Sequence, residues 1–170
     1  MNEALGNALL FKLAIGFILI LSAIFLGSFA YSKAFKVNNR IIEEIEKNGE
    51  TSGRQTTTLA NALNAYNNDV AAEIERWLVS GDNNRGIGYR VSSGKAHCNY
   101  DKPGAVLMDG INNNYEYCVY QINTCHADGS KERCGVYYHV ITYMYVDFPL
   151  LELFLIPVHG ETRTFEVLNS

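Results

Sequence analysis

The stretch "LAIGFILILSAIFLGSFAY" (residues 13–31), followed directly by "SKAFKVNNRIIEEIEKNG" (residues 32–49), decides the fold of this chain. The first stretch has no charged side chain and matches the roughly 20 apolar residues needed to cross the hydrocarbon core of a bilayer. Because lipid offers no partners to backbone N–H and C=O groups, such a segment must be helical. We predict a membrane-spanning helix over residues 13–31, preceded by a short tail (residues 1–12) in which Lys12 marks the lipid boundary.

The second stretch predicts that this helix continues beyond the membrane. It contains no proline, and its first glycine is Gly49. Its apolar residues recur at helical spacing between charged ones: Ala34, Phe35, Val37, Ile41, Ile42 and Ile45. Asn48–Gly49 is a typical helix end. The pattern therefore predicts one helix from near Leu9 to Asn48, about 60 Å long, with nearly a third of it outside the lipid.

Two other interpretations of the apolar run remain open. It could be the buried core helix of a soluble protein, although its length favours a span. It could also be a cleaved secretory signal, whose apolar core is usually about 7–15 residues long and is followed by a small-x-small site. Ser28 and Ala30 supply only a poor version of such a site.

A second helix is expected over residues 57–80, after a polar turn at residues 50–55. Its apolar residues form one stripe: Leu59, Leu63, Tyr66, Val70, Ile74, Trp77 and Leu78. An antiparallel return along the first helix would bury both stripes.

The remainder of the chain has the alternation and turn signals of short strands. Successive strands with turn-type links imply an antiparallel sheet over about residues 86–168. Pro157 restricts residues 151–160 to an edge position, if they form a strand at all. The expected fold class is α+β, with a tail, span and stalk helix over residues 1–49 and an α+β domain over residues 50–170. The individual strand candidates are residues 87–93, which are weak, and residues 115–123, 135–148 and 162–168.

Four cysteines, Cys98, Cys118, Cys125 and Cys134, lie in the C-terminal half. Three pairings are possible if all are bridged. We favour Cys125–Cys134 across a hairpin loop and Cys98–Cys118 between a loop and a strand, each contributing about 2–3 kcal/mol. Disulfides persist outside the reducing cytosol, so this prediction places the C-terminal domain on the extracytoplasmic side of the cell membrane.

Zinc binding and thiol redox chemistry are alternative uses of these cysteines. His97 and His126 lie beside Cys98 and Cys125. However, neither a zinc knuckle nor a redox-active CxxC pair is present. We therefore expect no metal site and no cofactor.

The charges that flank the span favour the opposite orientation. Lys33, Lys36 and Arg40 follow it, whereas only Lys12 and the amino terminus precede it. The positive-inside rule would place the large domain in the cytoplasm. The cysteines and the flanking charges thus give conflicting predictions, of which we favour the extracytoplasmic one.

Catalysis and nucleic-acid binding are not indicated. The formal net charge of the 170 residues is -4, so no basic surface points to nucleic acid. The chain has no GxSxG, HExxH, P-loop or GxGxxG motif. We expect Glu43, Glu44 and Glu46 to form a solvated helix face, and His139 and His159 to be structural. No residue is predicted to be catalytic.

Two stretches resemble those of TadE-like minor pseudopilins of the tight-adherence pilus machinery. They are "SKAFKVNNRIIEEIEKNGETSG" (residues 32–53) and "YYHVITYMYVDFPLLELFLIPVHGETRTF" (residues 137–165). The first has a basic residue followed by an apolar and acidic helix that ends in glycine. The second has a long strand and two prolines before a last strand. A membrane helix that runs into a solvent-exposed helix capped by a sheet is also how pilins are built.

The resemblance implies a single-pass, non-catalytic component of a pilus, with roles in adhesion or secretion. Its partners would be the lipid bilayer and other pilins or pilus-assembly proteins, bound through the N-terminal helix. Processed prepilins carry glutamate five residues after the cleavage site, where this chain has Phe11 after Gly6. Both a fibre subunit and an anchored accessory protein therefore remain open.

Small and aromatic residues mark the expected packing positions on the first helix. Gly16, Ala23 and Gly27 would allow helices to approach closely, although small residues are also simply common in spans. Tyr31 and Phe35 are expected at the membrane interface, where aromatic rings are favoured.

Two other functions remain as alternatives. The first is a membrane-tethered extracytoplasmic binding or sensor domain, for which the helix would be a spacer. The second is a membrane-anchored enzyme or thiol oxidoreductase.

Overall fold

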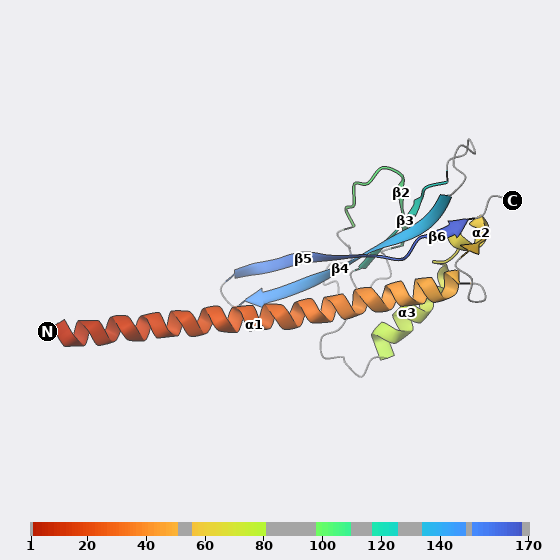
Figure 1. The fold of residues 1–170 in the computed structure, drawn as a ribbon. Coiled ribbons are helices and arrows are strands. Elements are labelled where there is room, and N and C mark those ends of the chain that lie inside the picture. The colour runs from red at the N-terminus through yellow and green to blue at the C-terminus, as the bar shows by residue number, and fades with distance from the viewer. Residues whose placement is uncertain are drawn as a thin grey trace.

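The computed structural model describes residues 2–50, 56–80, 98–109, 117–125, 134–148 and 151–167. It has the expected α+β fold, in which one long helix runs along a sheet and projects far beyond it (Figure 1). We call the part built on the sheet the head. The helices are α1 (Asn2–Gly49), α2 (Leu59–Leu63) and α3 (Asn68–Ser80). The strands are β1 (Thr56–Thr57), β2 (Ala105–Asp109), β3 (Tyr117–Asn123), β4 (Cys134–Phe148), β5 (Leu151–Glu161) and β6 (Phe165–Val167).

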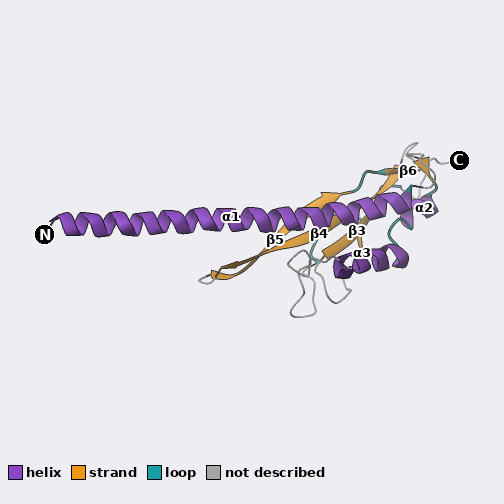
Figure 2. Cartoon of the chain, turned by 90° about the horizontal axis from the view of Figure 1, so that it is seen from below, coloured by secondary structure: helices purple, strands orange, loops and turns teal. Residues whose placement is uncertain are grey.

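Helix α1 is continuous, as its sequence predicts. It contains 48 residues and is therefore about 72 Å long. It begins at Asn2 rather than near Leu9 and ends at Gly49, next to the predicted stop. Figures 1 and 2 show no sharp bend where the predicted span meets the stalk.

The sheet is organised around its longest strand, β4. Among the described residues the strand order is β1-β6-β4-β3-β2. Strands β6 and β5 pair with successive parts of β4: β6 with residues 134–136 and β5 with residues 139–148. The pairs are antiparallel apart from the short β1–β6 pair. Pro157 is part of β5 and lies opposite Tyr143 of β4. Among the described strands, β5 pairs only with β4. The edge position that Pro157 required is confirmed.

The second helix expected over residues 57–80 is present but bent, because the chain forms α2 and α3 with a break between them. The Asn67 side chain accepts hydrogen bonds from the backbone N–H groups of Asp69 and Val70, both at 3.0 Å, and so caps the start of α3. At the end of α2, the Tyr138 hydroxyl donates to the carbonyl oxygens of Ala62 and Leu63. Tertiary hydrogen bonds therefore replace the helical ones at the break.

The other strand predictions have different outcomes. Residues 115–123, 135–148 and 162–168 correspond to β3, β4 and β6. Strand β2 was not predicted, and the weak candidate at residues 87–93 lies outside the described residues.

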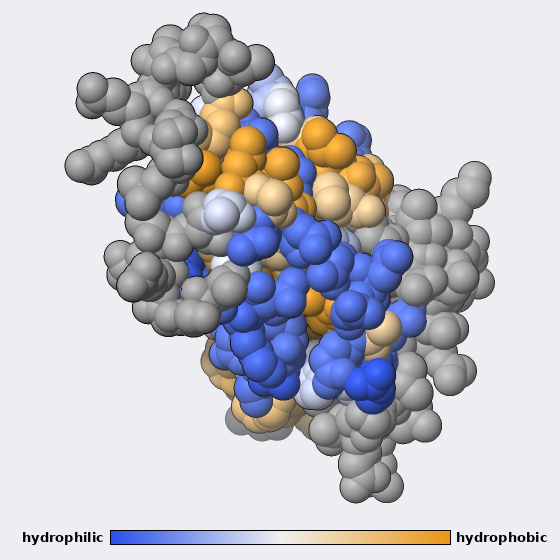
Figure 3. Space-filling view, turned by 90° about the vertical axis from the view of Figure 1, so that its right-hand side faces the viewer, coloured by the Kyte–Doolittle hydropathy of each residue, from blue (hydrophilic) through white to orange (hydrophobic). Residues whose placement is uncertain are grey.

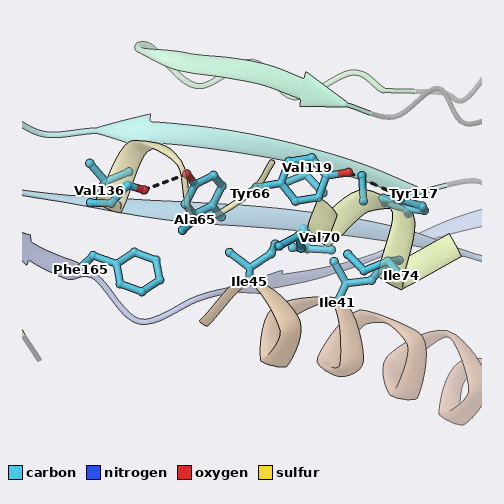
Figure 4. Packing of buried hydrophobic residues seen from close by; sticks show 14 of the residues in the cluster. Ile41, Ile45, Ala65, Tyr66, Val70, Ile74, Tyr117, Val119, Val136 and Phe165 are labelled. Atoms are coloured by element: carbon cyan, nitrogen blue, oxygen red, sulfur yellow. Dashed lines mark hydrogen bonds between the residues drawn. The ribbon is translucent and has the colours of Figure 1, made fainter. Parts of the chain in front are cut away.

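The main core joins the C-terminal third of α1 to α2, α3 and one face of the sheet (Figure 4). Ile41 and Ile45 on α1 are fully buried, and Val70 and Ile74 on α3 pack with them. The residues from the sheet are Tyr117, Val119, Cys134, Val136, Tyr138, Val140, Phe165 and Val167. Residues 1–49 and 50–170 thus share one core.

Helix α3 returns along α1 in the antiparallel direction, as expected. The Asn48 amide donates to the Ala65 carbonyl at 2.9 Å, near the start of the return. Further along, the Arg40 guanidinium lies 5.9 Å from the centre of the Trp77 ring. The start of the return therefore meets the end of α1, and a late residue of α3 meets α1 about two turns earlier.

Asn38 makes the central polar contact between α1 and the sheet. Its side chain is buried, and its amide donates to the carbonyl oxygens of Val140 at 3.0 Å and Val158 at 3.1 Å. One residue of α1 thereby joins β4 and β5. A Cβ atom on Gly160 would lie 2.0 Å from the Asn38 Oδ1 atom, so only glycine allows this approach.

Thr142 adds a second polar contact on the same side. Its hydroxyl donates to the Ala34 carbonyl at 3.1 Å, one turn before Asn38. At the other end of the contact, the Glu46 carboxylate accepts the backbone N–H of Arg163 at 2.7 Å. Polar contacts therefore fix the register of α1 on the sheet along its whole buried length.

We predict that Asn38→Leu destabilises the head by about 1–3 kcal/mol, because two buried carbonyl oxygens lose their donor. Asn39→Leu is the matched control, since Asn39 is the exposed neighbour and surface changes usually stay within about 0.5 kcal/mol. Urea unfolding of the full chain in detergent would measure both. Equal stability of the two variants would contradict the role given to Asn38.

Gly160→Ala tests the same contact from the sheet. Overpacking of this kind typically costs about 1–3 kcal/mol. We expect a lower urea midpoint than that of the wild type, and an unchanged midpoint would show that the helix need not lie so close.

Candidate functional site

The N-terminal part of α1 is an exposed apolar surface, which we call the rod (residues 9–35). This helix is long and apolar enough to cross a membrane, and its most apolar window is not buried by the head. Its large apolar side chains are exposed on all sides: Leu9, Leu10, Phe11, Leu13, Ile15, Phe17, Ile18, Leu19, Ile20, Leu21, Ile24, Phe25, Leu26, Phe29, Tyr31 and Phe35. An exposed apolar surface of this extent marks a membrane or protein contact.

The polar side chains of the rod are satisfied within the helix. The hydroxyls of Ser22 and Ser28 donate to the carbonyl oxygens of Ile18 and Ile24, at 2.8 and 2.9 Å. Neither hydroxyl therefore needs water or another partner, which suits an apolar environment.

The predicted packing positions lie on one face of the rod. At about 100° per residue, Gly16, Ala23 and Gly27 share the face of Ala34, which packs against Val158 of β5. Among the described residues, no atom lies within 4 Å of where a Cβ on Gly16 or Gly27 would be. This small-residue face is thus the extension of the face that packs on the sheet.

The predicted aromatic residues lie where the rod approaches the head. Tyr31 and Phe35 are exposed, and their rings stack with centres 6.2 Å apart. The opposite end of the head, viewed along α1, has a hydrophilic area with an apolar patch above it (Figure 3). Exposed large apolar side chains are therefore most numerous on the rod, with a smaller group on β2 at Val106, Leu107 and Met108.

Two disulfides, Cys98–Cys118 and Cys125–Cys134, cross-link the head. These are the pairings favoured from the sequence. All four sulfur atoms are bonded in these two bridges. The bonds fit an extracytoplasmic domain.

The Cys98–Cys118 bond fixes a second, smaller cluster on the sheet face remote from α1. This cluster contains Cys118, Tyr120, Ile122, Ile141 and Tyr143, with Cys98, Tyr100, Ala105 and Tyr137 packed against it. The covalent bond holds residues 98–105 over the sheet, where they cover part of its outer face.

A hydrogen-bonded group of ionisable side chains lies on this outer face. His139 Nδ1 is 3.1 Å from Glu161 Oε1, and His139 Nε2 is 2.9 Å from His159 Nδ1. The Tyr100 ring stacks on His139, with centres 4.1 Å apart. The antiparallel register creates the group, because it places His139 opposite Glu161 and brings His159 onto the same face.

His139 is buried within this group, and its environment favours the neutral imidazole. Burial is the main cause that lowers the pKa of His139, and the hydrogen bond to Glu161 opposes it. The charges of His159 and Lys102 lower this pKa further. A neutral His139 can donate to Glu161 through Nδ1 and accept from His159 through Nε2.

The sequence did not predict this group, although both histidines were expected to be structural. The sequence pattern that could have revealed the group is the alternation of His159 and Glu161, which places both side chains on one face of a strand. That pattern was not used because residues 151–160 were not clearly predicted to form a strand. Within the part of the chain that the structure describes, no three His, Cys, Asp or Glu side chains are placed to hold one metal ion. His97 and His126 lie outside the described residues.

The chain matches no protein-family model, no curated protein and no solved structure. What it does must be inferred from the geometry of the rod and the head.

We predict that the head loses stability as the pH falls below about 6.5, the usual value for histidine. The pKa of His139 is lower in the folded state than in the unfolded state. Below about pH 6.5 the unfolded chain therefore binds more protons, and the free energy of unfolding decreases with falling pH. Urea unfolding between pH 7.5 and 5.5 would measure this decrease.

His139→Gln is the control variant, because it removes the buried imidazole. We expect a smaller dependence of its stability on pH over the same range. The same slope in both proteins would mean that His139 does not contribute.

Proposed function

We propose that this chain is a non-catalytic, pilin-like subunit or accessory component of a tight-adherence pilus assembly. It is anchored in the cell membrane by a single pass of α1, with its head on the extracytoplasmic side. The observation that carries the proposal is the division of one continuous helix. Its N-terminal part is a bare apolar rod, and its C-terminal third is buried in the head.

The continuity of α1 suits assembly rather than simple tethering. A flexible linker would be sufficient to attach a domain to a membrane. A helix that is fixed to the head by Asn38 and Ile41 also determines the direction in which the rod points. The same apolar surface can then contact lipid while the chain is anchored and neighbouring rods once it is assembled.

The small-residue face supports contacts between rods. Helices in apolar surroundings associate through small residues that let their backbones approach. Gly16 and Gly27 have free space around them in the described structure. Partners would be other pilins or pilus-assembly proteins with apolar helices of their own.

A tethered binding or sensor domain is the second candidate. The observation that favours it is the group of His139, His159 and Glu161 on the outer face, of which His159 and Glu161 are exposed. In that case the rod would be only an anchor and spacer.

The orientation can be tested with new thiols, because all four native cysteines are bonded. We expect Val106→Cys, on exposed β2, to react with a membrane-impermeant maleimide in intact cells. Lys12→Cys is the matched variant and should react only after permeabilisation. The reverse pattern would show that the positive charges after the span determine the orientation, and would contradict the proposal.

The pilus role can be tested in the organism that encodes the chain. Deletion should abolish or strongly reduce the fibres sheared from the cell surface. Wild-type protein should restore them, whereas Leu19→Glu, which places a charge on the rod, should not. Val106→Glu is the control, because Val106 is about as exposed (57%) as Leu19 (58%) but lies on the head. Unchanged fibres in the deletion strain would refute the pilus role and favour the sensor.

A further inference from the structure

Strands β4 and β5 extend together beyond the rest of the sheet. Strand β3 pairs with β4 only as far as Thr142, whereas β5 pairs with it as far as Phe148. We call the two-stranded extension, residues 143–148 and 151–157, the arm. Figures 1 and 2 show that the arm runs beside α1 toward the N-terminus.

The arm reaches the level of the apolar rod. The hydrogen bond from Thr142 to the Ala34 carbonyl fixes the level at which it begins. From there to Phe148 the strand extends about 20 Å, at about 3.3 Å per residue. That length corresponds to about 13 residues of helix, so the end of the arm lies near the level of residue 21. The arm is therefore level with much of the predicted span.

Bare lipid is a poor environment for the arm, although its sequence is mostly apolar. Among the described strands, β5 pairs on one side only and leaves a row of backbone groups without strand partners. In hydrocarbon each unsatisfied group costs several kcal/mol.

Water is also an unfavourable environment for the arm, because the arm is an apolar strand pair with an edge that no described strand pairs with. A long apolar edge strand is a template for pairing with another chain. Strand addition would satisfy the free backbone groups of β5 directly. The features of the arm therefore point to an extended segment of protein as its partner.

A second copy of this chain offers such a segment in a suitable direction. Copies anchored in one membrane share one orientation, so β5 of each runs away from the membrane and β4 runs toward it. Strand β5 of one copy can therefore pair in the antiparallel direction with β4 of the next. Over residues 144–148, β4 pairs with β5 and with no other described strand, so its second edge can receive a strand there.

We propose that the arm joins neighbouring copies, with β5 of one copy adding to the outer edge of β4 of the next. The contact uses a different surface on each side, and such heterologous contacts repeat into rings or helical filaments. This inference rests on the pilin-like function proposed above and identifies a second contact between subunits.

Photo-crosslinking of the full chain in membranes of its own organism tests the proposal. A benzoylphenylalanine residue at Leu153 should give a covalent dimer on illumination, and the cross-link in the dimer band should map to residues 144–148 of the other copy. The same probe at Val106, exposed on β2, should not give that cross-link and is the control. Mixing isotopically heavy and light copies shows that the link is intermolecular.

The other outcomes separate the two proposals. A probe at Phe17 reports contacts of the rod. If copies cross-link through position 17 but position 153 gives only lipid adducts, a different protein or no adduct, the arm proposal is refuted and the pilin-like function stands. If neither position gives a dimer and the deletion strain retains its fibres, both proposals fail. Disulfide content and circular dichroism would establish that each probe variant is folded.

Discussion

The burial of the last third of α1 against the sheet is the contact on which the rest of this molecule depends. Ile41 and Ile45 provide the apolar part, and full burial of one such side chain is worth about 1.5–3 kcal/mol. Asn38 makes the position of α1 on the sheet specific, because its amide donates hydrogen bonds to two carbonyl oxygens on different strands. Apolar packing alone would tolerate a shift along the helix, whereas these hydrogen bonds select one register.

Once that register is fixed, the other features follow from geometry. The rod must point away from the head along the direction set by the buried third of α1. The arm must lie beside it, because β4 and β5 are held to Asn38 and Ala34 before they extend further. The disulfide at Cys98 then closes the outer face of the sheet without using α1. The rod and the arm therefore extend from the same side of the head.

The sequence predicted those parts of the fold that depend on local pattern. The uncharged run and the absence of proline before Gly49 were sufficient for α1. The strong alternation of residues 135–148 was sufficient for β4, and the positions of the cysteines indicated both bridges. Each of these features is set by residues that are near one another in the chain.

The features that were missed depend on contacts between distant residues. The break before Asn67 is stabilised by Tyr138, which lies far along the chain, so helical periodicity could not reveal it. The group around His139 exists only because of the register between β4 and β5. The small-residue positions could be identified, but not the fact that they share the face that packs on the sheet.

The most direct test of this account is a distance measured across the junction of rod and head. Spin labels at Leu19 and Lys47, both exposed, can be attached through new cysteines and measured by pulsed electron resonance in the full chain in lipid nanodiscs. A continuous helix predicts a narrow distribution near about 42 Å. A clearly shorter or broad distribution would show a bend or hinge between the labels, and would contradict a single helix that is both membrane anchor and stalk.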